Sequence, residues 1–185
     1  MQRLRYELLD IINQAVEFAR CLEVVTGSKP SFRKRHNGFY IVEGYSKTLC
    51  ELLVKPLDIE KLRKYIEYNV ETITSFLRAF FDSEGTVEKN GNIRVYNTDL
   101  RLLNYVKELL LKLKIQATGP YLCVKRGAPT YDRSVGKTYY TNKDTYYLYI
   151  RAKSRRRFAK IVGFTVKRKM ERLMKALNLP LYFSH

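Results

Sequence analysis

The segment TSFLRAFFDSEG, residues 74–85, decides the fold of this chain. Its apolar residues recur at the spacing of a helix face, and it ends in two acids and a glycine, Asp82, Glu84 and Gly85. Acids are unfavourable at a helix C-terminus, because the last carbonyl groups carry partial negative charge. The pattern therefore predicts that a positive group comes to this helix end, and a divalent metal ion is the obvious candidate.

Three small residues of the same predicted helix, Ser75, Ala79 and Ser83, are spaced by four. They lie in one row along a helix face, so a second helix can approach closely there. Gly85 is expected in the left-handed conformation that often follows a helix. An ordinary core helix with a surface acid and a glycine cap explains the same residues, and the physics alone leaves both interpretations open.

The order LRAFFDSEG, residues 77–85, resembles the motif of the LAGLIDADG homing endonucleases. Glu84 falls on the penultimate acid, which binds the catalytic metal in that family. Ala79 and Ser83 fall on small positions where two motif helices pack together. Arg78 departs from the family, which usually has a small residue there.

The chain after the motif predicts an α+β fold. Asn90-Gly91 between two short strand-like runs is a strong hairpin signal, Asp99 is a plausible N-cap, and Gly119-Pro120 ends a unit. The predicted elements are a hairpin over 86–96, a helix from Asp99 to Leu113, strands 121–126 and 145–151, an extra short strand at 137–140, and one basic helix over 154–178. This order, αββαββα, is that of one LAGLIDADG half, whose four strands form a curved antiparallel DNA-binding sheet.

The first third of the chain is similar to an incomplete copy of the same unit. The predicted elements are a strand at 3–6, a helix over 13–26, a hairpin of 31–35 and 39–43 around Asn37-Gly38, a helix over 46–53 and a short connecting helix over 56–68. Residues 1–71 are thus expected to form an incomplete N-terminal half with a connector, and residues 72–185 a complete C-terminal half. No first motif is visible, so the resemblance implies a pseudo-dimer with a preceding piece of chain or a homodimer through the motif helix.

The charge of the chain points to a polyanionic partner. The net charge is +17, and residues 121–185 hold 16 Lys or Arg against 3 acids. Fifteen tyrosines and the absence of Trp fit nucleic acid better than a membrane surface. No apolar run approaches the roughly 20 residues needed to cross a bilayer, and the first residues lack a secretory pattern. An intracellular, cytoplasmic protein is expected.

Cysteine and histidine usage restricts the chemistry. Cys21, Cys50 and Cys123 have no metal-ligand spacing, and their odd number disfavours a disulfide framework. His36 and His185 are the two histidines, which excludes a His-based zinc site and a His/Cys-box nuclease site. Metal chemistry is therefore left to carboxylates.

The catalytic candidates follow from the resemblance. Glu84 is expected to bind Mg²⁺ or another divalent cation, and Asp82 is the second, less favoured, metal ligand because its motif position is more often structural. Lys153 and Lys47 occupy the junction of strand and helix where the family often has a catalytic lysine, and Asn97 the position of a polar residue beside the active-site water. Each also has an ordinary explanation, as a solvated or phosphate-contacting lysine and as a turn residue.

The faces of the predicted sheets are expected to read double-stranded DNA. Arg, Lys and polar side chains on a two-stranded ribbon can reach base edges in the major groove. The candidates are Arg33, Arg35, Arg94, Lys125, Arg133, Lys137, Tyr147, Tyr149 and Arg151, with Arg155, Arg156 and Arg157 assigned to phosphates.

The resemblance implies a site-specific, metal-dependent DNA endonuclease, encoded within an intron, that makes double-strand cuts at a long site. The alternative is a non-catalytic nucleic-acid binder on the same fold, such as an intron RNA-splicing maturase or a regulator. An RNA-binding protein on an unrelated α+β fold is disfavoured by the two Asn-Gly hairpins and the repeated order of elements.

Overall fold

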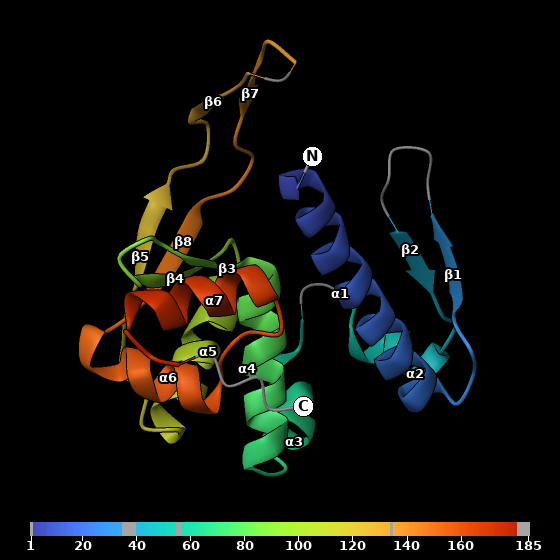
Figure 1. The fold of residues 1–185 in the computed structure, drawn as a ribbon. Coiled ribbons are helices and arrows are strands. Elements are labelled where there is room, and N and C mark those ends of the chain that lie inside the picture. The colour runs from blue at the N-terminus through green and yellow to red at the C-terminus, as the bar shows by residue number, and fades with distance from the viewer. Residues whose placement is uncertain (1, 35–39, 55–56, 134, 181–185) are drawn as a thin grey trace. The chain divides into compact units, whose positions relative to one another are not determined.

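The computed structural model describes residues 2–34, 40–54, 57–133 and 135–180 and has an α+β fold (Figure 1). It divides into two compact units: an N-terminal unit of residues 1–62 with 166–168, and a C-terminal unit of residues 63–165 with 169–185. Within the described ranges, no helix is long and apolar enough to cross a membrane. Whether the two units are an incomplete and a complete repeat stays a prediction.

The N-terminal unit is a long helix, a hairpin and a short helix. Its elements are α1 (Gln2–Thr26), β1 (Ser31–Lys34) paired antiparallel with β2 (Tyr40–Glu43), α2 (Lys47–Leu52) and the first residues of α3 (Ile59–Ile66). The hydroxyl of Ser46 caps α2 by accepting the Leu49 N–H at 3.2 Å. The predicted turn at Asn37-Gly38 lies outside the described residues.

The strand predicted at residues 3–6 is wrong, because these residues lie in the first turns of α1. That prediction depended on matching a strand of the later copy. The local sequence favours a helix, since Arg, Leu and Glu are strong helix formers and neither Gly nor Pro interrupts residues 2–26.

The C-terminal unit carries the predicted motif helix and a four-stranded sheet. Its elements are α4 (Val70–Glu84), β3 (Gly85–Val87), β4 (Ile93–Asn97), α5 (Leu100–Lys112), β5 (Ala117–Val124), β6 (Pro129–Asp132), β7 (Lys137–Tyr140), β8 (Thr145–Ile150), the 3₁₀ turn η1 (Ala152–Ser154), α6 (Arg155–Ile161) and α7 (Lys167–Ala176). The sheet order is β3-β4-β8-β5 with every pair antiparallel, and β6 and β7 form a separate ribbon. The predicted α+β fold is confirmed.

One face of the sheet is buried and the other is open. Ile93, Val95, Leu148 and Ile150 are fully buried, and α4 and α5 pack against this face. Phe81 of α4 meets Phe158 of α6 edge-on, with ring centroids 4.8 Å apart. Because strand residues alternate between faces, the side chains between these buried positions point to the open face.

Two boundary predictions in the C-terminal unit are wrong. The single helix predicted over 154–178 is broken into α6 and α7 at Gly163, which has φ +60° and donates its N–H to Phe158 O at 2.8 Å. The apolar periodicity continues through this break, so the glycine was the informative residue. Gly119-Pro120 does not end a unit but lies within β5, at a register shift between Thr118 and Tyr121.

Gly85 ends α4 for a different reason from the predicted one. Its φ is −88°, an extended conformation, so the left-handed prediction is wrong. A Cβ at this position would lie 2.4 Å from the carbonyl oxygen of Phe81. Glycine is therefore required by close approach of the backbone to the last turn of α4.

The C-terminal ends of the helices receive cations from other elements. Lys169 of α7 donates to the carbonyl oxygens of Phe81 and Asp82 at the end of α4. Arg78 of α4 donates through Nε to Val162 O at 2.6 Å, at the end of α6. Each cation reaches the last turn of a helix, where carbonyl groups lack partners within the helix, although Phe81 O also accepts the N–H of Gly85.

The same arrangement closes the two remaining helices of this unit. Arg157 of α6 donates through Nε to Leu113 O at 2.7 Å, at the end of α5. Arg156 of α6 donates through Nη2 to Leu177 O at 3.0 Å, just beyond α7. Helices α4, α5, α6 and α7 are thus joined end to side by charged hydrogen bonds.

We expect Arg78→Met to lower the free energy of unfolding of the C-terminal unit by about 2 kcal/mol, because it removes charged hydrogen bonds while keeping a similar side-chain volume. Urea denaturation followed by circular dichroism measures the change. Lys160→Gln, at an exposed position of α6, is the control and should leave the midpoint unchanged. An unchanged midpoint for Arg78→Met would contradict the proposed role of the arginine.

Candidate active site and nucleic-acid interface

The two acids at the end of α4 have different surroundings. The carboxylate of Asp82 accepts the backbone N–H of Thr165 at 3.0 and 3.1 Å, just before α7. Glu84 is the last residue of α4 and its side chain is exposed. Asp82 thus contributes to the packing of α7 on α4, while the carboxylate of Glu84 is accessible to an external cation.

The positive group expected at this helix end is present within the protein. Lys169 binds the carbonyl oxygens of the last turn of α4, so the unfavourable electrostatics that suggested a metal ion are compensated by a lysine. A metal at Glu84 is therefore supported by the exposure of this acid at the end of the motif helix, and not by the helix dipole.

A row of tyrosines crosses the sheet that begins after α4. Glu84 ends α4, and the next residue, Gly85, pairs with Val95, the neighbour of Tyr96 in β4. Tyr96 pairs with Tyr147, and their rings are 5.9 Å apart; Tyr147 pairs with Tyr121, at 5.6 Å. Three aromatic rings therefore cross the open face of β4, β8 and β5.

Asn97 lies at the same end of the sheet as Glu84. It is the last residue of β4, one residue beyond Tyr96. Its Oδ1 accepts the N–H of Asp99 at 2.8 Å, and Asp99 in turn caps α5. Asn97 therefore has a structural role in the turn, and its amide NH₂ group is the part that could contact a bound water.

The two candidate lysines are not placed beside Glu84 by the register of the sheet. β8 runs antiparallel to β4, so Lys153, which follows it in η1, lies beyond the end of the sheet opposite to Glu84. Lys47 belongs to the N-terminal unit, where it begins α2 and lies 4.0 Å from the carboxylate of Glu51. The catalytic roles of both lysines stay predictions.

A charged network covers the open face near the Asn90-Gly91 turn. Arg94 forms an ion pair with Glu88 at 3.0 Å, and the other oxygen of Glu88 accepts from Asn92 at 2.9 Å. The guanidinium of Arg94 lies 5.6 Å from the centre of the Tyr147 ring. The pKa of Arg94 is raised, first by a hydrogen bond to the side chain of Tyr96 and also by the charge of Glu88.

Arg155 extends this network from α6. The hydroxyl of Tyr149 donates to Asn92 Oδ1 at 2.9 Å, and Arg155 donates to both groups. Its guanidinium also lies 5.6 Å from the centre of the Tyr149 ring. The structure thus brings together Arg94, Tyr147, Tyr149 and Arg155, which were predicted separately as DNA contacts.

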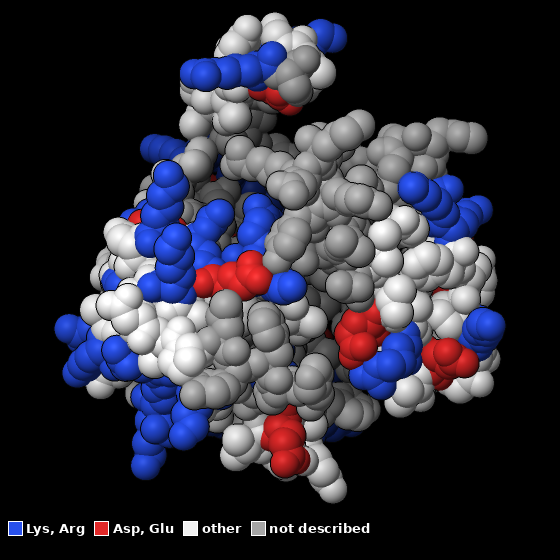
Figure 2. All heavy atoms as spheres, in the orientation of Figure 1, with Lys and Arg blue, Asp and Glu red and all other residues white. Residues whose placement is uncertain are grey.

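The other predicted contacts are distributed over the chain. Arg156 and Arg157 hold helix ends, Arg33 is paired with Glu43 at 2.9 Å, and Arg35 lies outside the described residues. The exposed residues of the predicted set in the C-terminal unit are Lys125, Arg133, Lys137, Arg151, Arg156 and Arg157. Figure 2 shows how Lys and Arg outnumber Asp and Glu on the visible face of this unit.

Four residues of the interface were missed by the sequence analysis: Glu88, Asn92, Tyr96 and Tyr121. A signal for Tyr96 was available, because the apolar residues Ile93 and Val95 alternate with Arg94 and Tyr96. Tyr96 therefore lies on the same face of β4 as Arg94. Glu88 and Asn92 flank the Asn90-Gly91 turn, and the turn brings them within hydrogen-bonding distance.

The described residues contain no group of three or more His, Cys, Asp or Glu side chains that could hold a metal ion. Glu84 offers one exposed carboxylate. A Mg²⁺ ion keeps several water ligands and is often held by one or two carboxylates, so a single Glu84 fits as part of a magnesium site.

The sequence and the fold agree with one family. A family model described as the LAGLIDADG-like domain matches residues 71–163, which lie entirely within the C-terminal unit. The chain belongs to this LAGLIDADG-like family. The predicted resemblance is confirmed.

Solved structures of the homing endonuclease I-DmoI have the same fold. A structure of I-DmoI mesophilic variants is 19% identical, with a TM-score of 0.54 over 83% of this chain and 74% of that chain. A structure of I-DmoI with DNA and Mn is 22% identical, with a TM-score of 0.50 over 76% of this chain and 66% of that chain.

Among curated proteins, an uncharacterized protein of Methanocaldococcus jannaschii is 41% identical over 146 residues, 78% of this chain and 51% of that protein. A DNA polymerase of Thermococcus litoralis is 30% identical over 141 residues, 72% of this chain and 8% of the polymerase. The chain therefore spans about half of the first relative and a small part of the second.

We expect Glu88→Gln to raise the affinity for random-sequence duplex DNA about two- to fivefold, because it removes an acid from the open face and frees Arg94 from a partly exposed ion pair. Fluorescence anisotropy measures the dissociation constant. Glu71→Gln, at the exposed first turn of α4, changes the net charge equally and should change the affinity less. Equal effects of the two substitutions would show that the overall charge, and not the position of Glu88, matters.

Proposed function

We propose that this chain acts as a site-specific DNA endonuclease of the homing type, which makes metal-dependent double-strand cuts at a long recognition site and is encoded within an intron. The observation that carries the proposal is the position of Glu84. It is an exposed acid at the end of the motif helix, directly before the edge strand β3 of a sheet whose open face carries Arg and Tyr, in a chain of the LAGLIDADG-like family.

In this proposal Glu84 provides a carboxylate ligand for Mg²⁺ or another divalent cation. When bound, the ion supplies water activation and stabilises charge on the phosphate oxygens. Asn97 orients the water through its amide NH₂ group, since its Oδ1 is already used by Asp99. Asp82 contributes by holding α7 against α4, and Lys153 and Lys47 contact phosphates.

A double-strand cut needs a second acid, and we propose that it comes from the Glu84 position of another motif helix. The row of Ser75, Ala79 and Ser83 is exposed on α4 and is narrow enough for close helix packing. A homodimer through α4, or a preceding piece of the same polypeptide, would supply this helix.

DNA recognition is assigned to the open face of the sheet. A guanidinium can bind guanine in the major groove through two hydrogen bonds, which suits Arg94 and Arg151. Tyr149 pairs with Arg94 across β4 and β8, Tyr147 lies two residues before it, and both tyrosines would contact bases or sugars. I-DmoI, which shares the fold, has been crystallised in complex with DNA and Mn, and this supports the assignment.

A second candidate is a non-catalytic binder of DNA or intron RNA on the same fold, a maturase or a regulator. One observation favours it. Within the described ranges, the only acid exposed at the end of the motif helix is Glu84, and no acid cluster surrounds it.

We expect Glu84→Gln to lower the rate of duplex cleavage at least about a hundredfold, because the loss of a metal ligand removes several kcal/mol of transition-state stabilisation. Binding to the same duplex should change little. The rate is measured on a plasmid library with long random inserts, with Mg²⁺ and with EDTA, and EDTA should stop cleavage by the unaltered chain.

Asp82→Ala is the matched variant at the neighbouring acid. It should lower the free energy of unfolding by about 1 kcal/mol, because the Thr165 N–H before α7 loses its carboxylate acceptor. The folded protein should still cut. Cleavage that survives Glu84→Gln would contradict the role of Glu84 as a metal ligand. No cleavage by the unaltered chain with any divalent metal would contradict the endonuclease and favour the binder.

A further inference from the structure

Arg155 at the start of α6 uses its guanidinium within the protein. Its Nη2 donates to the side-chain oxygens of Asn92 and Tyr149, and its Nη1 lies 3.4 Å from the carbonyl oxygen of Asn90. Its Nε is buried and has no hydrogen-bond partner within the described part of the chain. An arginine that binds phosphate presents its fork of N–H groups to the ligand, whereas the N–H groups of Arg155 are turned to the hairpin.

Asn92 connects Arg155 to an acid. Its Oδ1 accepts from Arg155 and from the hydroxyl of Tyr149 at 2.9 Å, and its Nδ2 donates to Glu88 Oε2 at 2.9 Å. The amide has one favourable orientation, because its oxygen faces two donors and its nitrogen faces a carboxylate. Asn92 therefore passes the position of Arg155 on to the carboxylate of Glu88.

Glu88 in turn holds Arg94 on the open face of the sheet. Its Oε1 lies 3.0 Å from Arg94 Nη1, and 37% of the Arg94 side chain is exposed. The guanidinium also lies 5.6 Å from the centre of the Tyr147 ring. An aromatic ring and a carboxylate on two sides restrict the rotation of Arg94, while its exposed part can still reach a ligand.

The turn that carries Asn92 is itself held in place. Gly91 has φ +78°, and a Cβ at this position would lie 2.9 Å from the Ala176 side chain of α7. The backbone N–H of Asn92 also donates to Asn90 Oδ1 at 3.1 Å. The chain of contacts from α6 to Arg94 thus passes through a backbone that packs closely on a helix.

A fixed arginine suits base recognition better than attraction to phosphate. A guanidinium binds guanine through two hydrogen bonds, which require a defined plane, and a side chain that is already ordered loses less conformational entropy on binding. The negative charge of Glu88 beside Arg94 weakens the attraction to phosphates at any sequence. The network therefore favours a matched base over an arbitrary stretch of backbone.

We infer that Arg155 and Asn92 are positioning residues for DNA recognition. They hold Glu88 in the orientation that aims the guanidinium of Arg94 at a guanine of the bound duplex. Arg155 and Asn92 themselves touch neither base nor phosphate. This inference rests on the proposed function, since it concerns the same duplex, and it assigns one base preference to residues that lie outside the contact.

The test measures base preference by binding, without cleavage. The protein is bound to a duplex library with a random central segment, and the bound sequences are read by sequencing. Arg94→Met identifies the position that Arg94 reads, as the one where a preference for guanine disappears. The unaltered chain should prefer guanine there roughly ten- to hundredfold over other bases, as expected for a good contact of two hydrogen bonds.

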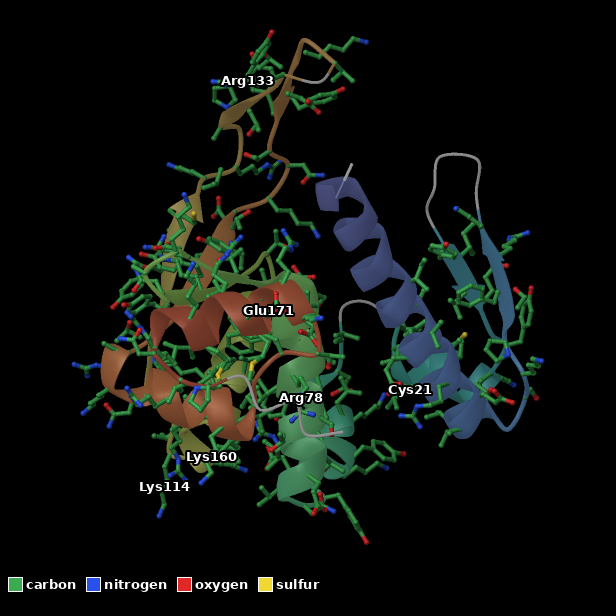
Figure 3. All side chains as sticks on the ribbon, in the orientation of Figure 1. Cys21, Arg78, Lys114, Arg133, Lys160 and Glu171 are labelled. Carbon is green, nitrogen blue, oxygen red and sulfur yellow. The ribbon has the colours of Figure 1, made fainter. Side chains whose placement is uncertain are left out.

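Arg155→Met should reduce the guanine preference at that position to about threefold or less, because Arg94 is then no longer held in one plane. Preferences at other positions should stay as they are. Lys160→Met is the matched control, since it removes the same charge from an exposed position of the same helix, where the side chain points away from the sheet (Figure 3). It should leave every preference unchanged.

Asn92→Asp breaks the network at a single link. The new carboxylate still accepts from Arg155 and Tyr149, so the turn keeps these bonds, but it repels Glu88 in place of donating to it. The guanine preference should fall as it does in Arg155→Met. Urea denaturation of each variant checks that the C-terminal unit is folded under the binding conditions.

Salt dependence separates a positioning residue from a phosphate contact. Arg155→Met and Lys160→Met should give equal slopes of log K against log salt on random-sequence duplex, because neither arginine nor lysine releases counterions there. An arginine that binds a phosphate would instead contribute about 0.9 to the slope, and its loss would be visible in Arg155→Met alone.

A guanine preference that survives either Arg155→Met or Asn92→Asp in folded protein would overturn the inference. So would a smaller slope for Arg155→Met alone, or a library in which the unaltered chain enriches no guanine that depends on Arg94. A chain that has this preference and never cuts would leave the inference standing while the proposed endonuclease failed. Cleavage by a chain without it would do the reverse.

Discussion

The C-terminal unit depends on one type of interaction, the charged hydrogen bond from a Lys or Arg of one element to the last carbonyl groups of another helix. Lys169, Arg157, Arg78 and Arg156 close α4, α5, α6 and α7 in this way. The last turn of a helix has carbonyl groups without partners and a partial negative charge, and an arginine or lysine satisfies both at once. Four helices are thereby fixed around a single sheet, and the end of α4, which carries Glu84, is held in place.

This interaction divides the positive charge of the chain into two groups. One group points inward to helix ends, and Arg172 adds a bond to Val87 O at 2.9 Å in β3. The other group lies on the open sheet face, in η1 and along the ribbon, where Lys125, Lys137 and Lys153 are exposed. Net charge alone therefore overstates the charge available for DNA, because part of it neutralises the protein's own helix ends.

The sequence was sufficient for the fold of the C-terminal unit and for the position of the motif helix. Asn90-Gly91 and the Asp99 cap fixed the hairpin and α5, because each has a specific local geometry. The break at Gly163 was missed, since the apolar spacing continues across it. The strand predicted at 3–6 is wrong, because helix propensity decides the local structure there and similarity to the later copy does not.

The candidate site was less predictable than the fold. Glu84 could be chosen from the motif, but the cation at the end of its helix, Lys169, is 85 positions away in the sequence and no local pattern connects them. The same holds for Arg155 and Asn92, which lie 63 positions apart in the sequence and meet through a side-chain hydrogen bond. Tertiary packing determines which polar residues meet when they are far apart in the sequence. The spacing of apolar residues along the chain does not predict these contacts.

The division of cations into two groups is the central claim, and lysine acetylation with and without duplex DNA, read by mass spectrometry, tests it most directly. The account predicts that duplex DNA protects Lys125 and Lys137 from acetylation, that Lys114 and Lys160 react equally in both states, and that Lys169 reacts slowly even without DNA. Rapid acetylation of Lys169 in the free protein would contradict the division of cations into two groups. So would DNA protection of Lys114 and Lys160 in place of Lys125 and Lys137.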